Sequence, residues 1–321
     1  MRYKNIFILV VVFLTISMRA DAREDKLGKC LFVTSYHKGY AWQDGIEKGL
    51  RSVLEGKCEI RQFDMDTKRN PSPEFCRQKA LEAKALIESW KPDIVIASDD
   101  NASKYLVAPY FKDAKLPFVF CGVNWTAEEY GYPYSNVTGM IEISPIRPMI
   151  KALTQIMPGA KTGACLIPDR LTPIKSAQRL KKIFDTAGIT LSAQKVNTMD
   201  DFKKKFIEAQ DADFIMLLNN SGVNDWDKNR AGDIVLKHSR KLTLTLNRWM
   251  MPYAMLGMTT VPEEQGEYAA EVALNILEGN RPGDIPVIAN RKRDTYVNKT
   301  LLKTAGISLP TSILQQAKTT D

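Results

Sequence analysis

The chain has 321 residues, of which 44% are hydrophobic and 26% are charged, and this length is enough for two domains that each bury a core. Its formal net charge is +8, but the basic residues are scattered along expected helices rather than gathered on a recognisable module. This distribution excludes nucleic acid as a partner and supports only a weak attraction for anions. The chain has two His, and its five Cys lack the spacing of metal ligands, so we expect neither a metal nor a cofactor.

The first residues have the pattern of a secretory signal peptide. Arg2 and Lys4 precede an apolar run at residues 6–14, and an A-x-A cleavage site ends at Ala22. A membrane anchor is the alternative, but the apolar run is shorter than the roughly 20 residues that span a bilayer. We therefore expect a signal peptide at residues 1–22 and a periplasmic or secreted protein that is soluble once this peptide is removed.

Two of the Cys are placed to form a disulfide. Cys30 and Cys58 each follow Gly-Lys, and each opens an expected strand. Because these strands are the first and second of the expected sheet, the two positions come close together. A bridge would close a loop of roughly 30 residues and stabilise the fold by about 3 kcal/mol. Two buried free thiols are the alternative.

The first half of the chain alternates short apolar strands with helices. Wholly apolar runs such as residues 94–97 are typical of strands that are covered on both faces. Serial βα units of this kind form a doubly wound sheet with right-handed crossovers. In such a sheet the loops at the carboxyl ends of the strands line the ligand crevice. We expect strands at residues 30–33, 60–65, 94–97 and 117–121, and helices at residues 46–54, 73–90 and 105–110.

The pattern restarts after residue 140, with helix starts at Ser144-Pro145 and Thr172-Pro173 and a capping box formed by Thr198 and Asp201. The fold class that we predict is therefore α/β, with two doubly wound, Rossmann-like lobes and a ligand cleft between them. In the second half we expect strands at residues 162–167, 214–218, 242–246 and 285–289. We expect helices at residues 145–157, 173–188, 198–210 and 262–279, and a further helix that follows residue 221 and ends at residue 235.

Several segments carry a resemblance to a known family. The segment that matches best reads I-L-E-G-N-R-P-G-D-I-P at residues 276–286, and the others lie at residues 116–123, 137–139, 157–161, 266–270 and 302–310. In their order and spacing they resemble a type 1 periplasmic substrate-binding protein of an ABC transporter, from the family that includes tryptophan- and tyrosine-type binding proteins. The opening S-Y-H-x-G-Y-x-W at residues 35–42 resembles a subgroup whose members also occur as extracellular parts of sensor proteins.

The resemblance implies two lobes that close on a ligand by bending at hinges. It also implies that the chain crosses between the lobes near Ile141, Val261 and Asp284. The first lobe would then comprise residues 23–141 and 262–285, and the second lobe residues 142–261 and 286–321.

The loops after the expected strands supply the candidate ligand-binding residues. Tyr40 and Trp42 can stack on a planar group, and either Asp99 or Asp100 can hold an ammonium group or hydroxyls while the other caps a helix. At the start of that helix, free backbone N–H groups favour an anion such as a carboxylate. The full set of candidates is Tyr40, Trp42, Asp99, Asp100, Asn101, Ser103, Asn124 and Trp125 from the first lobe, and Asp169, Asn220, Asn247 and Trp249 from the second. Arg170 and Arg248 either pair with an acid group or lie at the surface.

Three functions compete. The first is a solute receptor that captures a small polar or zwitterionic ligand and delivers it to an ABC permease; an amino-acid-like ligand is favoured. The second is a receptor of the same fold that presents its loaded form to a membrane sensor protein. For either receptor we expect a monomer. The third is an enzyme, which we do not expect because none of the dinucleotide, P-loop, nucleophile-elbow or zinc-protease motifs is present.

Overall fold

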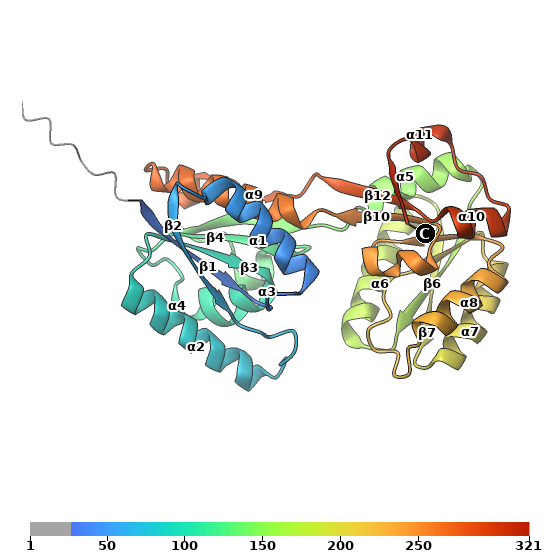
Figure 1. Ribbon diagram of the computed structural model, residues 1–321, viewed down its shortest axis with the longest axis horizontal. Coiled ribbons are helices and arrows are strands. Elements are labelled where there is room, and N and C mark those ends of the chain that lie inside the picture. The colour runs from blue at the N-terminus through green and yellow to red at the C-terminus, as the bar shows by residue number, and fades with distance from the viewer. Residues whose placement is uncertain (1–26, 321) are drawn as a thin grey trace, which may run out of the picture.

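The computed structural model describes residues 27–320, apart from the side chains of residues 171 and 172. The expected signal peptide at residues 1–22 lies outside the described part of the chain. Two α/β lobes lie side by side and are joined by a few chain segments (Figure 1). Within the described residues, no helix is long and apolar enough to cross a membrane.

The first lobe is built on a six-stranded parallel sheet with the order β11-β5-β4-β3-β1-β2. Its strands are β1 (Gly28–Thr34), β2 (Cys58–Asp64), β3 (Ile94–Ser98), β4 (Phe118–Asn124), β5 (Val137–Glu142) and β11 (Ile288–Ala289).

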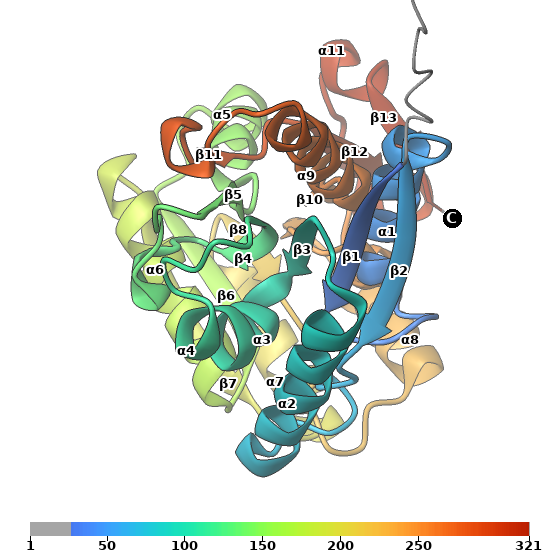
Figure 2. The same cartoon turned by 90° about the vertical axis from the view of Figure 1, so that its left-hand side faces the viewer.

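Helices cover both faces of this sheet, because successive residues of a strand point to opposite sides. Along β1, Cys30 and Phe32 pack with helices α1 (Ala41–Leu54) and α9 (Pro262–Leu277). Leu31 and Val33 pack on the other face, with α2 (Pro73–Trp90) and a continuous helical segment. That segment consists of α3 (Asp99–Ala102), a π-helical turn (Ser103–Val107) and α4 (Ala108–Tyr110). Figure 2 shows α9 and α2 on opposite sides of the sheet.

The second lobe has a seven-stranded sheet with the order β13-β12-β10-β9-β8-β6-β7, in which only the β10–β12 pairing is antiparallel. Its strands are β6 (Thr162–Pro168), β7 (Thr190–Val196), β8 (Phe214–Leu217), β9 (Leu242–Thr245), β10 (Leu256–Thr260), β12 (Arg293–Val297) and β13 (Ala317–Thr319). Its helices are α5 (Ile146–Ile156), α6 (Leu171–Thr186), α7 (Met199–Glu208), α8 (Lys228–His238), α10 (Lys299–Ala305) and α11 (Thr311–Leu314).

Both lobes share one arrangement of their first five strands, since β2-β1-β3-β4-β5 in the first lobe corresponds to β7-β6-β8-β9-β10 in the second. In such a sheet the ligand crevice lies at the carboxyl ends of the strands, where the strand order reverses. The expected fold class of two doubly wound lobes is confirmed.

The chain crosses between the lobes three times. The first crossing follows β5 and the second follows β10, close to the expected positions at Ile141 and Val261. The third follows β11, which pairs with β5 and so keeps residues 288–289 in the first sheet. The family resemblance implied a crossing near Asp284, before that strand.

The elements that differ from the sequence-based expectation have identifiable causes. Strand β7 was not expected, because it is an edge strand in which four of the seven residues are exposed, and its apolar signal is weak. The helix expected from residue 105 begins at Asp99, since the polar residues after β3 already form its first turn. The capping box of Thr198 and Asp201 is present. Helix α6 begins at Leu171, ahead of the expected cap at Thr172.

Cys30 and Cys58 form a disulfide in this structure, with their Cα atoms 6.0 Å apart. The pair lies at the amino ends of β1 and β2, where the parallel register places Gly28 opposite Cys58. Among the described residues, the other three Cys are free and buried.

Candidate functional site

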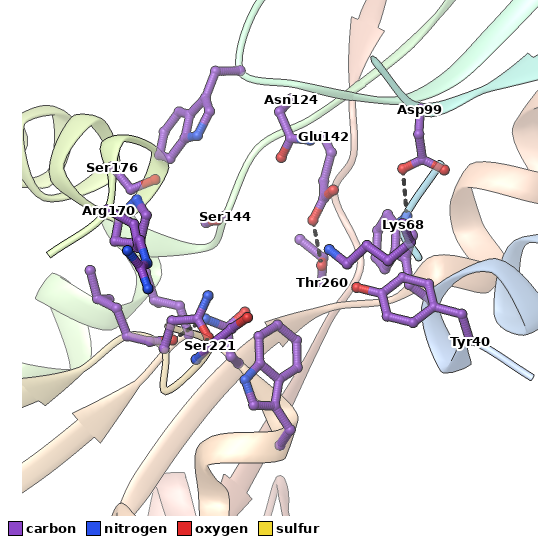
Figure 3. Close-up of a pocket in the computed structure, with 18 of the residues that line it drawn as sticks. Tyr40, Lys68, Asp99, Asn124, Glu142, Ser144, Arg170, Ser176, Ser221 and Thr260 are labelled. Atoms are coloured by element: carbon purple, nitrogen blue, oxygen red, sulfur yellow. Dashed lines mark hydrogen bonds between the residues drawn. The ribbon is translucent and has the colours of Figure 1, made fainter. Parts of the chain in front are cut away.

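A cavity of about 480 Å³ lies between the two lobes, at the carboxyl ends of their strands (Figure 3). Residues from the first lobe, from the second lobe and from two of the crossing segments contribute to its wall. The lining residues are Tyr36, Tyr40, Trp42, Lys68, Asp99, Asn124, Trp125, Glu142, Ser144, Arg170, Pro173, Ser176, Leu180, Leu218, Asn219, Ser221, Leu246, Asn247, Trp249 and Thr260.

The loop after β1 brings aromatic rings to the first-lobe wall. Tyr36 and Tyr40 pack edge to face, with ring centroids 5.2 Å apart. The Nζ atom of Lys68, from the loop after β2, lies 5.2 Å from the Tyr36 ring centroid and 5.1 Å from that of Tyr40. A cation over an aromatic face is attracted by the ring quadrupole, so the two rings hold the Lys68 ammonium group at the cavity edge.

A buried carboxyl group fixes the position of Trp42. Trp42 Nε1 donates to Asp99 Oδ1 at 2.9 Å, and Ser98 Oγ donates to Asp99 Oδ2 at 3.2 Å. Asp99 is only 1% exposed and has a left-handed backbone with φ +68°. Burial, followed by the charge of Glu142, raises the pKa of Asp99 well above its ordinary value. Asp99 therefore supports the indole from behind and presents little surface to the cavity.

Asp100 has a different role from that of Asp99. Its Oδ2 accepts from Asn124 Nδ2 at 2.7 Å, and its Oδ1 accepts from the Tyr130 hydroxyl at 2.8 Å. Burial raises the pKa of Asp100 above its ordinary value, although these two hydrogen bonds act in the opposite direction. Asp100 thus ties the loop after β4 to the start of α3, and this contact orients the Asn124 side chain at the cavity wall.

Glu142, the last residue of β5, brings a second carboxyl group to the cavity. Its Oε1 accepts from Thr260 Oγ1 at 3.0 Å, so a residue at the end of β5 is bonded to one at the end of β10 (Figure 3). Burial is the main cause that raises the pKa of Glu142 to about 7, and the Asp100 charge adds to it. Near neutral pH, both the protonated and the ionised form of this carboxyl group are therefore populated.

The second-lobe wall combines amide and hydroxyl groups with apolar side chains and one cation. Arg170 follows β6, and its guanidinium donates to Asn224 Oδ1 at 3.3 Å. Asn247 follows β9, and its amide donates to the backbone oxygen of Leu218. Trp249, two residues further on, is 53% exposed, so its ring is available to cover a ligand that occupies the cleft.

Trp125 joins the two lobes directly. It belongs to the loop after β4 and has a left-handed backbone with φ +66°, and its ring packs on the hydrophobic core of the second lobe. The Arg179 guanidinium carbon on α6 lies 5.6 Å from the centroid of the Trp125 ring. One side of the cavity is therefore closed by an aromatic contact between the lobes.

The chain matches the family described as "ABC transporter substrate binding protein" over residues 33–321. It belongs to this family. Among curated proteins, none shows significant similarity to this substrate-binding protein.

Solved structures with the same fold share little sequence with this substrate-binding protein. A ligand-free, open substrate-binding protein with adhesive properties from Clostridium difficile is 16% identical, with a TM-score of 0.73 over 92% of this chain and 99% of that chain. An ABC domain in complex with L-Trp from Streptococcus pneumoniae is 17% identical, with a TM-score of 0.64 over 92% of this chain and 99% of that one. A conserved domain protein from Vibrio cholerae is 19% identical, with a TM-score of 0.63 over 92% and 100% of the two chains.

The structure of this substrate-binding protein brings part of the predicted site together. The predicted residues that line the cavity are Tyr40, Trp42, Asp99, Asn124, Trp125, Asn247 and Trp249. Each lies at the carboxyl end of a strand or in the loop and first helical turn that follow it, which is why recognition of the strands indicated them.

Other predicted site residues lie outside the cavity. Asn101 donates to Thr67 Oγ1 at 2.8 Å, and Ser103 is fully buried in the helical segment after β3, so neither side chain lines the cavity. Asp169 pairs with Lys195 at 2.9 Å, away from the cleft. Asn220 is absent from the lining, although its neighbours Asn219 and Ser221 contribute to it. Asp100 acts through Asn124, as described above.

Sequence reasoning missed several residues of the wall. Glu142 and Thr260 were read only as parts of crossing segments, yet a polar residue at the carboxyl end of an otherwise apolar strand is a usable signal. Lys68 gave no local signal, because it lies in the exposed loop after β2. Arg170 lines the cavity, whereas the guanidinium carbon of Arg248 lies 5.2 Å from the Tyr296 ring centroid and outside the cavity. Within residues 27–320, no group of three or more His, Cys, Asp or Glu side chains could hold a metal ion.

Proposed function

We propose that this protein captures a small zwitterionic, amino-acid-like ligand between its lobes and delivers it to an ABC importer. The observation that carries the proposal is that one cavity holds groups of both signs, with Lys68 and Arg170 on the basic side and Glu142 on the acidic side. An uncharged sugar would leave these groups without charged partners in a desolvated cleft, which is unfavourable. A zwitterion pairs with both signs at once.

The rest of the cavity suits a ligand with an apolar or aromatic side chain. Trp42 is held by Asp99, and Trp249 is exposed on the opposite lobe, so a flat group can lie between rings from the two lobes. A volume of about 480 Å³ is within the range of small-molecule sites. The similar fold solved with L-Trp supports this ligand class.

Lobe closure supplies the capture step. The two walls belong to separate sheets that are joined covalently by the crossing segments and touch through Trp125, so a ligand that touches both walls binds more tightly when they approach. The closed form is then the species that a permease recognises. The family description supports delivery to an importer, and the expected signal peptide supports a periplasmic location.

A thermal-shift screen of purified protein tests the ligand class. The panel contains the twenty amino acids, nucleobases, sugars and small organic acids. We expect stabilisation by one or a few amino acids, and a ligand at one hundred times its dissociation constant adds about 2.7 kcal/mol of stability. Stabilisation by sugars alone, or by organic acids alone, would refute the zwitterion proposal.

A reconstituted transport assay tests delivery. Permease and ATPase components encoded by genes next to that of this protein are placed in vesicles. ATP hydrolysis is then measured with the empty and with the loaded binding protein. Stimulation by the loaded form is expected. Ligand binding without any effect on hydrolysis would contradict delivery while leaving ligand capture in place.

A further inference from the structure

Glu142 lies where the crossing segments meet. Its backbone oxygen accepts from Trp125 N at 2.9 Å, and its Oε1 accepts from Thr260 Oγ1 on the second crossing at 3.0 Å. The next residue, Ile143, donates its backbone N–H to Asn290 Oδ1 on the third crossing at 2.7 Å. A change at the Glu142 side chain is therefore transmitted to segments that must bend when the lobes close.

Among the three carboxyl groups beside the cavity, Glu142 is the one that can meet a ligand. Asp99 is only 1% exposed and accepts from Trp42 and Ser98. Asp100 does not line the cavity, and its two oxygens accept from Asn124 and Tyr130. Glu142 accepts its one side-chain hydrogen bond through Oε1, and within residues 27–320 no Lys or Arg pairs with it. Its Oε2 remains available in the cavity wall.

We propose that Glu142 is the carboxylate that binds the ammonium group of the ligand, and that its bond to Thr260 couples this binding to lobe closure. Asp99 is then a positioning residue that holds Trp42. This inference rests on the proposed capture of an amino-acid-like ligand and assigns the charge recognition within it to one residue.

The surroundings of Glu142 make ligand binding depend on pH. The carboxyl groups of Asp99 and Asp100 face it from the end of β3, and Tyr36 lies within range of its charge. From the loops, Lys68 lines the same cavity, and Arg170 faces it from the second lobe. On α9, Glu264 accepts from the backbone of Arg291 and Lys292, and Glu263 pairs with Lys48.

The sign of the pH effect follows from the charge of the ligand. Since the pKa of Glu142 in the empty protein is about 7, the carboxyl group is mostly protonated at pH 6 and mostly ionised at pH 8. An ammonium group binds the ionised form, so a ligand that arrives at pH 6 must displace a proton. Its affinity is expected to be about tenfold weaker at pH 6 than at pH 8.

Matched probes separate the two charges of an amino acid. L-Tryptophan carries both charges, tryptamine lacks the carboxylate, and indole-3-propionate lacks the ammonium group; L-leucine, isoamylamine and 4-methylvalerate form a second set with a smaller side chain. Dissociation constants are measured by calorimetry at pH 6 and pH 8 for the wild type and for Glu142→Gln, which keeps an oxygen for Thr260. Glu128→Gln is the control, because Glu128 is an exposed carboxylate of the same lobe that does not line the cavity.

In at least one set, we expect the amino acid to bind, the des-amino acid to bind at least tenfold more weakly, and the amine to retain more affinity than the des-amino acid. Glu142→Gln should lower the affinity for the amino acid by about tenfold or more at pH 8 and remove the difference between the two pH values. Glu128→Gln should behave as the wild type does.

The outcomes distinguish the two levels of the proposal. If an amino acid binds but Glu142→Gln binds it as tightly, with the same pH dependence, the assignment of Glu142 is wrong and the proposed function stands. If the des-amino acid binds as well as the amino acid, recognition of an ammonium group is wrong altogether. If no probe binds and the wider amino-acid screen is also negative, the proposed function fails and the assignment fails with it.

Discussion

The Trp42–Asp99 pair shows how one buried polar group determines the position of a side chain in the cavity. The indole N–H is the donor to Asp99 Oδ1, and the carboxyl group is shielded from water. A buried acceptor that loses its partner costs about 1–3 kcal/mol, which is more than the net contribution of the hydrogen bond itself. The pair therefore contributes to stability and also to preorganisation of the cavity wall.

Trp42→Phe tests this pair. The variant keeps an aromatic ring but removes the donor, and we expect unfolding free energy to fall by about 1–3 kcal/mol in urea denaturation at pH 7. Trp249→Phe is the matched control, because Trp249 is 53% exposed, and its substitution should change stability by less than about 0.5 kcal/mol. Equal losses of unfolding free energy in the two variants would show that the hydrogen bond to Asp99 does not contribute measurably to stability.

Glu142 should make stability depend on pH in a defined direction. Its pKa in the folded protein is about 7, above the ordinary value of 4.5, so the carboxyl group ionises more readily in the unfolded chain. Its stabilising contribution is complete below pH 4.5 and is lost as the pH rises through 7. At most about 3 kcal/mol is involved, from a shift of about 2.5 pH units.

Glu142→Gln removes this dependence. Relative to the wild type, the variant should have similar stability at pH 4.5 and gain stability progressively towards pH 8, as measured by urea denaturation at several pH values. Glu128→Gln should show no such trend. A wild type and a Glu142→Gln variant whose stabilities stay parallel from pH 4.5 to pH 8 would contradict the raised pKa. A gain in stability that accompanies weaker ligand binding is the trade-off expected at a functional site.

At the scale of elements, close packing against α1 fixes the position of α9 on the first lobe. Gly49 on α1 and Gly266 on α9 allow the two backbones to come together, because a Cβ atom on Gly266 would overlap the carbonyl oxygen of Ile46. At the start of α9, buried Gln265 accepts from Gly122 N at 2.8 Å and donates to Ile141 O at 3.4 Å. Helix α9 is thus bonded to β4 and β5 next to the cavity.

Gly266→Ala should separate α1 from α9. We expect a loss of about 1–3 kcal/mol in unfolding free energy, the usual cost of overpacking. The loss should lie near the upper end of this range, because the overlapping atoms belong to the backbone and cannot rotate away. Gly232→Ala on α8 is the control, since a Cβ atom there has no neighbour within 4 Å and Ala favours a helix by about 1 kcal/mol over Gly. A Gly266→Ala variant as stable as Gly232→Ala would disprove the close helix contact.

At the scale of the whole molecule, two sheets with separate cores share one cavity, and the lobes are connected at the crossings and at the Trp125 contact. This arrangement favours a change in the angle between lobes over a change within a lobe, because packed cores resist deformation. The Glu142–Thr260 hydrogen bond links two crossing segments and the Trp125 ring contacts the other lobe, so such a rotation would change both contacts.

Small-angle X-ray scattering should detect this rotation. For the best ligand of the thermal-shift screen, we expect the radius of gyration to fall when the wild type is saturated. Trp42→Ala at the same ligand concentration should keep the profile of the empty protein, since it lacks one wall of the site. Saturation of the wild type without any change in the scattering profile would contradict capture by lobe closure.

The sequence by itself determined the alternation of apolar strands and capped helices, and with it the two doubly wound lobes. These features are local: wholly apolar runs such as residues 94–97 and the capping box at Thr198 need no distant partner to be recognised. Residues at the ends of such strands or in the segments that follow them, including Trp42, Asn124 and Asn247, line the cavity. The edge strand β7 was missed, because an exposed strand has little apolar pattern.

Only the tertiary structure decided which polar groups turn toward the cavity and which are used within the fold. Asp99, Asp100 and Glu142 are all carboxyl groups next to strand ends, yet their partners differ. Within residues 27–320, Trp42 and Ser98 donate to the first side chain, Asn124 and Tyr130 to the second, and Thr260 alone to the third. These partners come from elements that are distant in the chain. Their contacts depend on how sheets and crossings pack, and no local pattern records that packing.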